Sequence, residues 1–150
     1  MSDAFDIIIN ELSQIVELPL NSAEDKCALL IDHKLNIQLE YNAEKDQLMI
    51  GSFLGEAPPG AYRKELFMAA LKANSFFPPV GYFAFEEQKN ALFYYDLLPI
   101  ANLTGPKLYN YLGKFVDKAL EWQEMAQNHL LPESGPDSQK PPPSRFHIKP

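Results

Sequence analysis

The chain has 150 residues, of which 46% are hydrophobic and 12% aromatic, and its formal net charge is −7. This length and composition predict one soluble domain with a core of its own, and they exclude a disordered chain and one with a membrane-spanning helix, because no apolar run approaches the roughly 20 residues that cross a bilayer. Residues 1–130 hold 10 Lys and Arg against 18 Asp and Glu, an acidic balance that repels phosphate backbones and argues against a nucleic-acid partner.

The N-terminus and the cysteine content predict a cytoplasmic protein. The start, MSDAFDIIINELSQ, carries acidic residues where a secretory signal peptide has a basic flank. Cys27 is the only cysteine, so no intramolecular disulfide can form and a reducing cytosol suits the chain. We expect this thiol to be a small buried residue, because free cysteines are among the most buried residue types.

The first predicted element is an amphipathic helix. Its apolar residues recur with helical spacing at Phe5, Ile8, Ile9, Leu12 and Val16. Ser2 or Asp3 is the expected N-cap, and Pro19 ends the helix. Ile7 lies off the apolar stripe and gives a first indication of a second apolar surface.

Residues 26–55 predict three strands in an antiparallel meander. The run KCALLID is almost continuously apolar, which is typical of a buried strand. The next strand is half exposed, since its apolar residues alternate with polar ones at Leu35, Ile37, Leu39 and Tyr41. The segment QLMIGSFLG follows a turn at NAEKD, and its Gly51 permits a bulge or a close approach of backbone.

The next two elements carry more apolar surface than one core needs. Residues 62–75 have the composition of a good helix, but their apolar side chains wrap widely around it, at Leu66, Phe67, Met68, Ala70, Leu71 and Ala73. Residues 81–98, GYFAFEEQKNALFYYDLL, predict a β-hairpin with large rings on both alternating faces. One face of the hairpin can pack on the core, and the other needs a different cover.

The last helix and the tail complete an α+β domain. Thr104 is the expected N-cap of a helix with Pro106 in its first turn, and helical spacing continues to about Leu130. The order α-β-β-β-α-β-β-α over residues 1–130 predicts a single domain in which helices pack in layers on a twisted antiparallel sheet. Residues 131–150 contain six prolines and predict a flexible tail, with a polyproline ligand at PPPSR as the alternative.

No residue pattern points to catalysis, a cofactor or a metal. The histidines at 33, 129 and 147 form no pair with metal-ligand spacing, and Asp32 beside His33 fits a solvated turn better than a catalytic dyad. The glycines form neither a phosphate loop nor a dinucleotide turn, and the serines lack the nucleophile elbow of hydrolases. Surplus apolar surface remains, and such surface marks contact with other chains.

Taken together, the segments ALLIDHKLNIQLEY, LKANSFF and GYFAFEEQKNALFYYDLLPIANLT, in this order of elements, resemble the class I type III secretion chaperones of Gram-negative bacteria over about residues 5–130. Such chaperones often have similar residues at the positions of Asp32, Leu71, Asn74, Leu98 and Pro99. The resemblance implies a small, acidic, cytosolic dimer that binds the N-terminal segments of secreted effectors and has no catalytic activity or cofactor.

The resemblance also implies two kinds of contact surface. The second helix and the strand after it would form a two-fold homodimer interface that maps to Leu66, Met68, Leu71, Phe83 and Phe85. The first helix and the sheet would receive the effector in an extended wrap that includes strand addition, at Ile7, Leu18, Leu20, Leu30 and Leu39. The acidic surface is expected to attract basic regions of the client or the secretion ATPase.

Two other interpretations remain open from the sequence. The first is a dimeric adaptor of the same fold with no link to secretion. The second is a small hydrolase whose site lies in a cleft between sheet and helix. The hydrolase predicts a deep pocket with convergent polar groups and a titratable residue of perturbed pKa.

Overall fold

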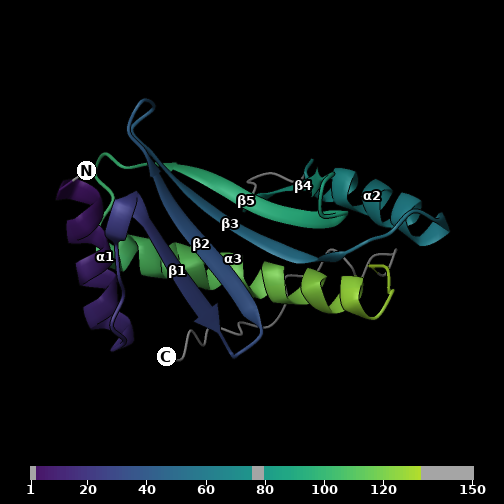
Figure 1. The fold of residues 1–150 in the computed structure, drawn as a ribbon, viewed down its shortest axis with the longest axis horizontal. Coiled ribbons are helices and arrows are strands. Elements are labelled where there is room, and N and C mark those ends of the chain that lie inside the picture. The colour runs from purple at the N-terminus through teal and green to yellow at the C-terminus, as the bar shows by residue number, and fades with distance from the viewer. Residues whose placement is uncertain (1–2, 76–79, 133–150) are drawn as a thin grey trace.

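The computed structural model describes residues 3–75 and 80–132 (Figure 1). The elements in chain order are α1 (Asp3–Val16), the 3-10 turn η1 (Ala23–Asp25), β1 (Lys26–Ile31), β2 (Leu35–Asn42), β3 (Gln47–Glu56), α2 (Ala61–Ala73), β4 (Tyr82–Glu86), β5 (Ala91–Pro99) and α3 (Gly105–Gln127). This order confirms the predicted α+β architecture. The proposed cap Ser2 and the tail from residue 133 onward lie outside the described residues.

The five strands form one antiparallel sheet in the order β1-β2-β3-β5-β4. The first three are the predicted meander, and the hairpin of β4 and β5 joins it through pairing of β5 with β3. A three-residue connection joins β1 to β2. Its first two residues, Asp32 and His33, have φ angles of 51° and 58°, as the central residues of a type I′ turn do, and the amide of Lys34 donates a 3.0 Å hydrogen bond to the carbonyl of Ile31. Asp32 and His33 are both exposed, as expected of a solvated turn.

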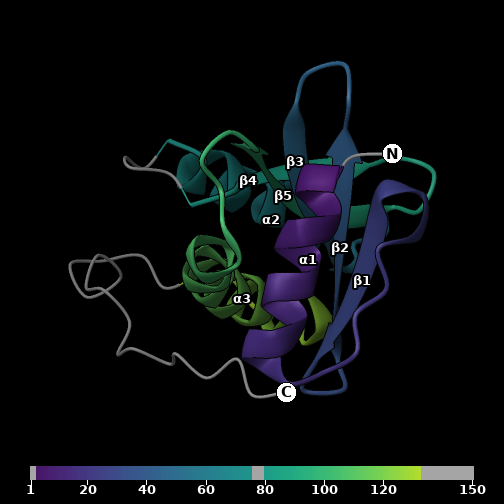
Figure 2. The ribbon, with the colours of Figure 1, turned by 90° about the vertical axis from the view of Figure 1, so that its left-hand side faces the viewer.

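Helices α1 and α3 lie on the same face of the sheet (Figures 1 and 2). The two helices meet where α3 begins, and the amide of Gly105 there donates a 3.0 Å hydrogen bond to Oε1 of Glu11. A Cβ at Gly105 would lie 2.4 Å from the Cβ of Glu11, so only glycine permits this approach. Among the described residues, no helix is both long and apolar enough to cross a bilayer.

Alternation along β2 directs one face of the sheet into the core. Leu35, Ile37 and Leu39 are fully buried, while the polar residues between them are exposed. Each fully buried side chain of this kind contributes about 1.5–3 kcal/mol relative to an exposed one. The inward face packs against α3, which buries Leu112 and Phe115 on its sheet-facing side.

The structure modifies two expectations about glycine and helix length. The register shift in β3 lies between Phe53 and Gly55, not at Gly51. Gly51 instead makes room for a ring, because a Cβ there would lie 2.5 Å from Cζ of Phe93. Helix α3 begins with the predicted cap, in which Thr104 accepts a 3.3 Å hydrogen bond from the amide of Lys107, but it ends at Gln127, earlier than Leu130.

The end of α3 is closed locally and held by α2. His129 has a φ of 54°, and the amide of Leu130 donates a 2.8 Å hydrogen bond to the carbonyl of Met125, which is the Schellman pattern. The Tyr62 ring stacks on His129 at 4.8 Å, and its hydroxyl lies 2.7 Å from the carbonyl of Leu130. Burial raises the pKa of Tyr62. The start of α2 therefore fixes the direction in which the chain leaves α3.

Candidate functional site

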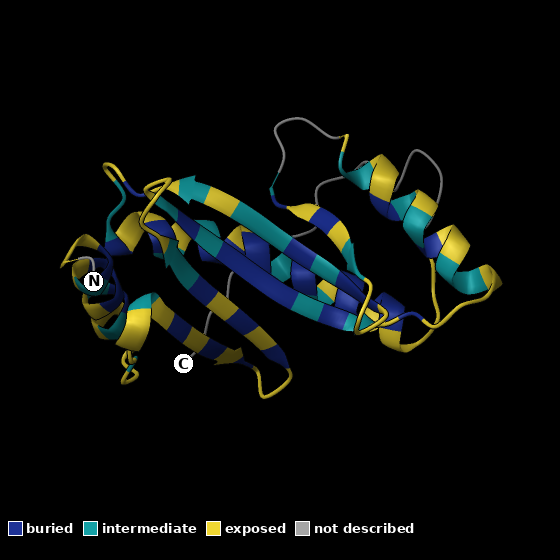
Figure 3. Cartoon of the chain, turned by 45° about the horizontal axis from the view of Figure 1, so that its top comes forward, coloured by how far each residue is buried: buried dark blue, intermediate teal, exposed yellow. Residues whose placement is uncertain are grey.

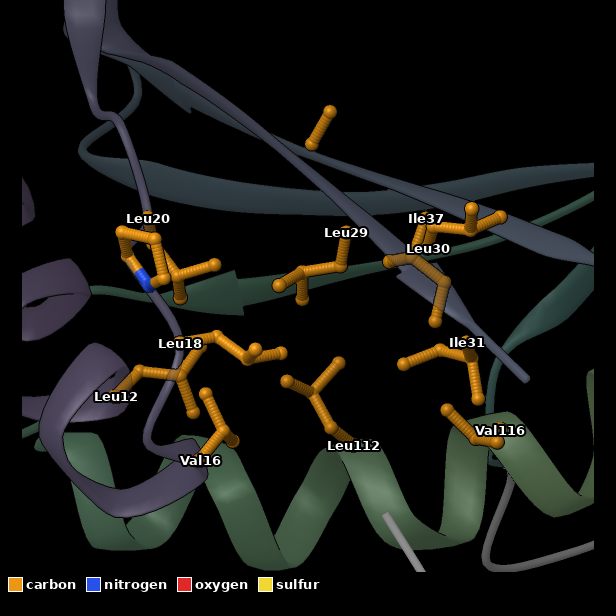
Figure 4. A pocket seen from close by; sticks show the side chains of 12 residues that line it. Leu12, Val16, Leu18, Leu20, Leu29, Leu30, Ile31, Ile37, Leu112 and Val116 are labelled. Carbon is orange, nitrogen blue, oxygen red and sulfur yellow. The ribbon is translucent and has the colours of Figure 1, made fainter. Parts of the chain in front are cut away.

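An apolar groove of about 320 Å³ lies between α1, the segment after it, β1 and α3 (Figure 4). It is lined by Leu12, Val16, Leu18, Pro19, Leu20, Ala28, Leu29, Leu30, Ile31, Ile37, Leu112 and Val116. Every one of these side chains is apolar. The groove is therefore suited to aliphatic or aromatic side chains of a ligand and offers no side-chain group for acid–base chemistry.

Ser13 holds one lip of the groove in place. Glu17, with a φ of 56°, ends α1, and the amide of Leu18 donates to the carbonyl of Ser13 at 3.2 Å. The hydroxyl of Ser13 donates to the carbonyl of Leu18 and accepts a 3.3 Å hydrogen bond from the amide of Leu20. This clamp folds residues 18–20 back along the helix, so that Leu18 and Leu20 face the groove.

The groove extends along the free edge of β1. β1 is an outer strand of the sheet, with a partner, β2, on one side only. Leu29 and Ile31 point to the core side and Ala28 and Leu30 to the opposite side, yet all four line the groove. Because residues from both faces of β1 contribute, the groove passes along the unpaired edge, where an added strand could form main-chain hydrogen bonds.

The structure separates the five residues expected to contact a client. Leu18, Leu20 and Leu30 come together in the groove, and Leu30 is 53% exposed. Ile7 is 59% exposed on α1 but does not line the groove. Leu39 has no exposed surface because it alternates inward on β2 and packs in the core, so we correct its assignment to a core residue.

Sequence reasoning did not identify the floor of the groove. Leu12 and Val16 of α1 and Leu112 and Val116 of α3 line it. Their helical spacing is the same whether a side chain packs against the sheet or faces a groove, so the pattern carries no signal that distinguishes the two.

The residues expected at a dimer interface are likewise divided. Met68 and Leu71 are 54% and 65% exposed on the outer side of α2. Leu66 is fully buried, and Phe83 is buried against Trp122 at a ring distance of 4.2 Å, so both pack inside the protomer. Phe85 is half buried, and its ring packs 4.7 Å from that of Phe67 on α2.

Rings on the outer side of the hairpin and of the neighbouring strand β3 form an aromatic face, which we define as Phe53, Tyr82, Phe93 and Tyr95. The ring of Phe93 lies 4.8 Å from Phe53 and 5.9 Å from Tyr95, and Tyr95 lies 6.1 Å from Tyr82. These residues cross β3, β5 and β4 on the side of the sheet opposite to α3, where the described chain places no helix (Figure 3). Tyr82 is exposed and the other three rings are half buried, so the protomer leaves the second apolar side of the hairpin only partly covered.

The two edges of the sheet differ in accessibility. At β4, the side chain of Asn74 forms two hydrogen bonds with the backbone of Phe83. Nδ2 of Asn74 donates to the Phe83 carbonyl at 3.0 Å, and the backbone amide of Phe83 donates to Oδ1 of Asn74 at 2.7 Å. This pair imitates the bonds of a neighbouring strand and blocks strand addition at that residue. The groove at β1 is therefore the better site for a peptide strand.

A polar network around Asp96 holds the start of β4 and lies outside the groove. The amide of Gly81 donates to Oδ2 of Asp96 at 3.2 Å, and the hydroxyl of Tyr111 donates to the same oxygen. Burial raises the pKa of Tyr111, and the hydrogen bond with Asp96 and the negative charge of Asp96 raise it further. Burial and then the same charge raise the pKa of Tyr94, whose hydroxyl donates to the carbonyl of Val80.

Neither this network nor the cysteine forms a catalytic constellation. Burial raises the pKa of the Cys27 thiol and so disfavours the reactive thiolate. Within residues 3–75 and 80–132, no three His, Cys, Asp or Glu side chains are grouped closely enough to hold a metal ion. The shifted tyrosines are structural hydrogen-bond donors, so the hydrolase interpretation finds no support in the geometry.

Comparison with solved structures finds chains of the same fold. A structure described as the HopA1–SchA chaperone–effector complex is 18% identical, with 81% of this chain and 94% of that chain covered and a TM-score of 0.66. The Yersinia pestis type III secretion chaperone SycH, in complex with a fragment of YscM2, is 22% identical, with 78% and 98% covered and a TM-score of 0.63. A chain of the ExoT–SpcS complex from Pseudomonas aeruginosa is 17% identical, with 81% and 98% covered and a TM-score of 0.62.

A family model gives the assignment. These structural identities establish likeness of fold alone, and comparison with curated proteins gives no match. The model of the Tir chaperone protein (CesT) family, however, matches residues 7–123, which is well over half of the chain and includes every described strand. The chain therefore belongs to the Tir chaperone protein (CesT) family.

Proposed function

We propose that this protein is a cytosolic type III secretion chaperone that binds the N-terminal segment of a secreted effector and keeps it unfolded for export. The observation that carries this proposal is the apolar groove along the free edge of β1. Family membership and the chaperone–effector complexes among the solved structures support it. The chaperone binds its client without catalysis.

The groove accounts for how a disordered segment could be held. A strand that pairs with β1 gains main-chain hydrogen bonds whatever its sequence, while alternate side chains enter the groove. Fixing each residue costs about 1–2 kcal/mol of backbone entropy, and each buried large apolar side chain returns about 1.5–3 kcal/mol. Several apolar anchors are therefore required, which favours clients with alternating apolar residues.

We further propose a two-fold homodimer that covers the aromatic face. Met68 and Leu71 on α2 are exposed, and the aromatic face is partly exposed, with Tyr82 at its exposed end and three half-buried rings beside it. One protomer therefore has two apolar surfaces that it does not cover fully. A two-fold contact can bury both at once, since each protomer supplies the same pair of surfaces to the other. The dimer would present two grooves to one extended client.

The acidic surface provides a second type of contact. Residues 1–130 have a net charge of −8 from 10 basic and 18 acidic residues. We infer that this surface attracts basic regions of the client or of the secretion ATPase, and that the interaction weakens as salt screens it. ATPase binding that is unchanged at high salt would contradict this part of the proposal.

The groove is tested by co-purification from the native bacterium. Leu30→Asp and Leu18→Asp place a charge at the groove, whereas Asn10→Asp adds the same charge at an exposed position of α1. We expect the unmodified chain and Asn10→Asp to co-purify with an exported protein whose N-terminal segment resists proteolysis, and both groove variants to lose it. Equal recovery with all variants would contradict the groove assignment, and a partner that is never exported would favour the adaptor interpretation.

A further inference from the structure

We propose that residues 144–150 of this chain, SRFHIKP, occupy the groove at β1 when no client is bound. The segment belongs to the tail that follows the last described residue, Pro132. The docking itself is independent of the proposed function, but its consequence, competition with the client, rests on that function. Charge, side-chain pattern and reach each support this occupant.

The charge argument concerns the wall of the groove. Residues 3–32, which form α1, the connection, β1 and the first residue of the turn after it, contain one basic residue, Lys26, and seven acidic ones, so their net charge is −6. Residues 33–130 contain 9 basic and 11 acidic residues, a net charge of only −2. Most of the negative charge of the body is therefore on the elements that build the groove.

The tail carries the complementary charge. Residues 138–150 contain Lys140, Arg145 and Lys149 and no acidic residue, a net charge of +3. Within the Debye length of about 8 Å at physiological salt, such a segment is attracted to the groove wall more strongly than to the rest of the surface.

The side-chain pattern of the tail matches an added strand. Prolines apart, Phe146 and Ile148 are the only large apolar residues in residues 133–150, and they alternate with Arg145, His147 and Lys149. In a strand paired with β1, Phe146 and Ile148 would point to the same side, into the groove, while the basic side chains would point away. The same geometry is expected of a client, so the tail would act as a weak substitute for it.

The tail is long enough to reach the groove. From Asn128 at the end of α3 back to Val116 in the groove, 12 residues at 1.5 Å each span about 18 Å. The 14 residues from Pro132 to Phe146 can extend to about 46 Å. The slack makes docking within one chain sterically easy, and a tether of this length gives an effective concentration of the order of millimolar.

The test uses the full chain with a paramagnetic label in the tail. His147→Cys supplies a thiol in the tail for a nitroxide. Cys27 is 5% exposed and burial raises the pKa of its thiol, so labelling at position 27 is slow. We expect the NMR methyl signals of Leu18 and Leu30 in the groove to lose most of their intensity, and those of Leu71 on α2 to keep it. Equal broadening at all three leucines, or at none, would overturn the proposal.

A matched variant separates specific docking from general proximity. Phe146→Ser with Ile148→Ser, in the same labelled background, keeps the length and charge of the tail but removes both anchors. The Leu18 and Leu30 signals should then recover. If they stay broadened, charge alone holds the tail and the assignment of Phe146 and Ile148 is wrong.

The outcome can be read separately from that of the proposed function, because the NMR experiment contains no client. If an effector co-purifies but the groove signals are not broadened, the chaperone function stands and the tail proposal falls. If the groove signals are broadened but no effector co-purifies, the tail proposal stands and the chaperone function falls. Where both succeed, the unlabelled Phe146→Ser and Ile148→Ser chain should bind a fluorescent N-terminal peptide of the co-purified effector several-fold more tightly than the unmodified chain. Unchanged affinity would rule out competition.

Discussion

At the residue scale, Gly105 determines how closely α1 and α3 approach, and thereby the width of one end of the layered core. A Cβ at this position would lie 2.4 Å from the Cβ of Glu11 and 3.1 Å from the backbone nitrogen of Leu12. The backbone atom cannot move aside as a flexible side chain can. The two helices would have to separate.

We therefore expect Gly105→Ala to lower the free energy of unfolding by about 2 kcal/mol, in the range of other overpacked sites. Urea unfolding followed by circular dichroism measures the change. Asn110→Ala, at an exposed position of the same helix, serves as the control and should alter stability by less than about 0.5 kcal/mol. Equal stability of the two variants would mean that the helices do not pack as closely as described.

The buried tyrosines give the protein an alkaline limit. Because the folded pKa values of Tyr94 and Tyr111 are raised above the unfolded value near 10, the neutral forms are favoured in the folded state. Their contribution to stability is fully present below about pH 10 and is lost as the pH rises above it. The free energy of unfolding falls by up to about 1.4 kcal/mol per pH unit for a fully buried tyrosine, and by less for the half-buried Tyr111.

We expect Tyr111→Phe to reduce this pH dependence. Urea unfolding of the unmodified chain and the variant at pH 8 and above pH 10 measures it. The unfolding free energy of the unmodified chain should fall more steeply across this interval. Identical falls would show that the Tyr111 hydroxyl is not held as a buried donor to Asp96.

At the element scale, periodicity predicted the strands and helices, but it could not assign their surfaces. The alternation in β2 predicted a strand with one outward face, yet Leu39, placed on the client surface by resemblance, belongs to the inward set with Leu35 and Ile37. The sequence predicts a surplus of rings on the hairpin, and the structure places Phe93 and Tyr95 on the aromatic face. The groove was not predicted, because it depends on which strand forms the sheet edge and on the Ser13 clamp.

The capped edge of β4 is a feature of elements in contact, and it makes a specific prediction. Asn74→Ala removes both hydrogen bonds to Phe83, so we expect faster hydrogen exchange at the Phe83 amide. Ser75→Ala, which loses only an exposed hydroxyl contact with the carbonyl of Lys72, should leave that rate unchanged. An unchanged rate in Asn74→Ala would indicate that another group covers this edge.

At the scale of the whole molecule, the aromatic face and the outer side of α2 are predicted to be covered by a second copy. We expect the unmodified chain to have a mass of about 34 kDa by light scattering, twice its 17.0 kDa. Met68→Asp with Leu71→Asp should convert it to a folded monomer. Lys45→Asp, which changes the net charge by the same amount in the exposed turn between β2 and β3, should remain dimeric. A monomeric unmodified chain would contradict the proposed dimer.

The central claim is that a secreted client occupies the groove at β1, and photo-crosslinking in the native bacterium tests it most directly. A photoreactive amino acid is placed at position 30 in the groove or, as a control, at position 45 in the β2–β3 turn. The account predicts that position 30 crosslinks to the N-terminal segment of an exported effector and that position 45 does not. The account would be contradicted if position 30 gave no crosslink, or if it crosslinked only to a protein that is never exported.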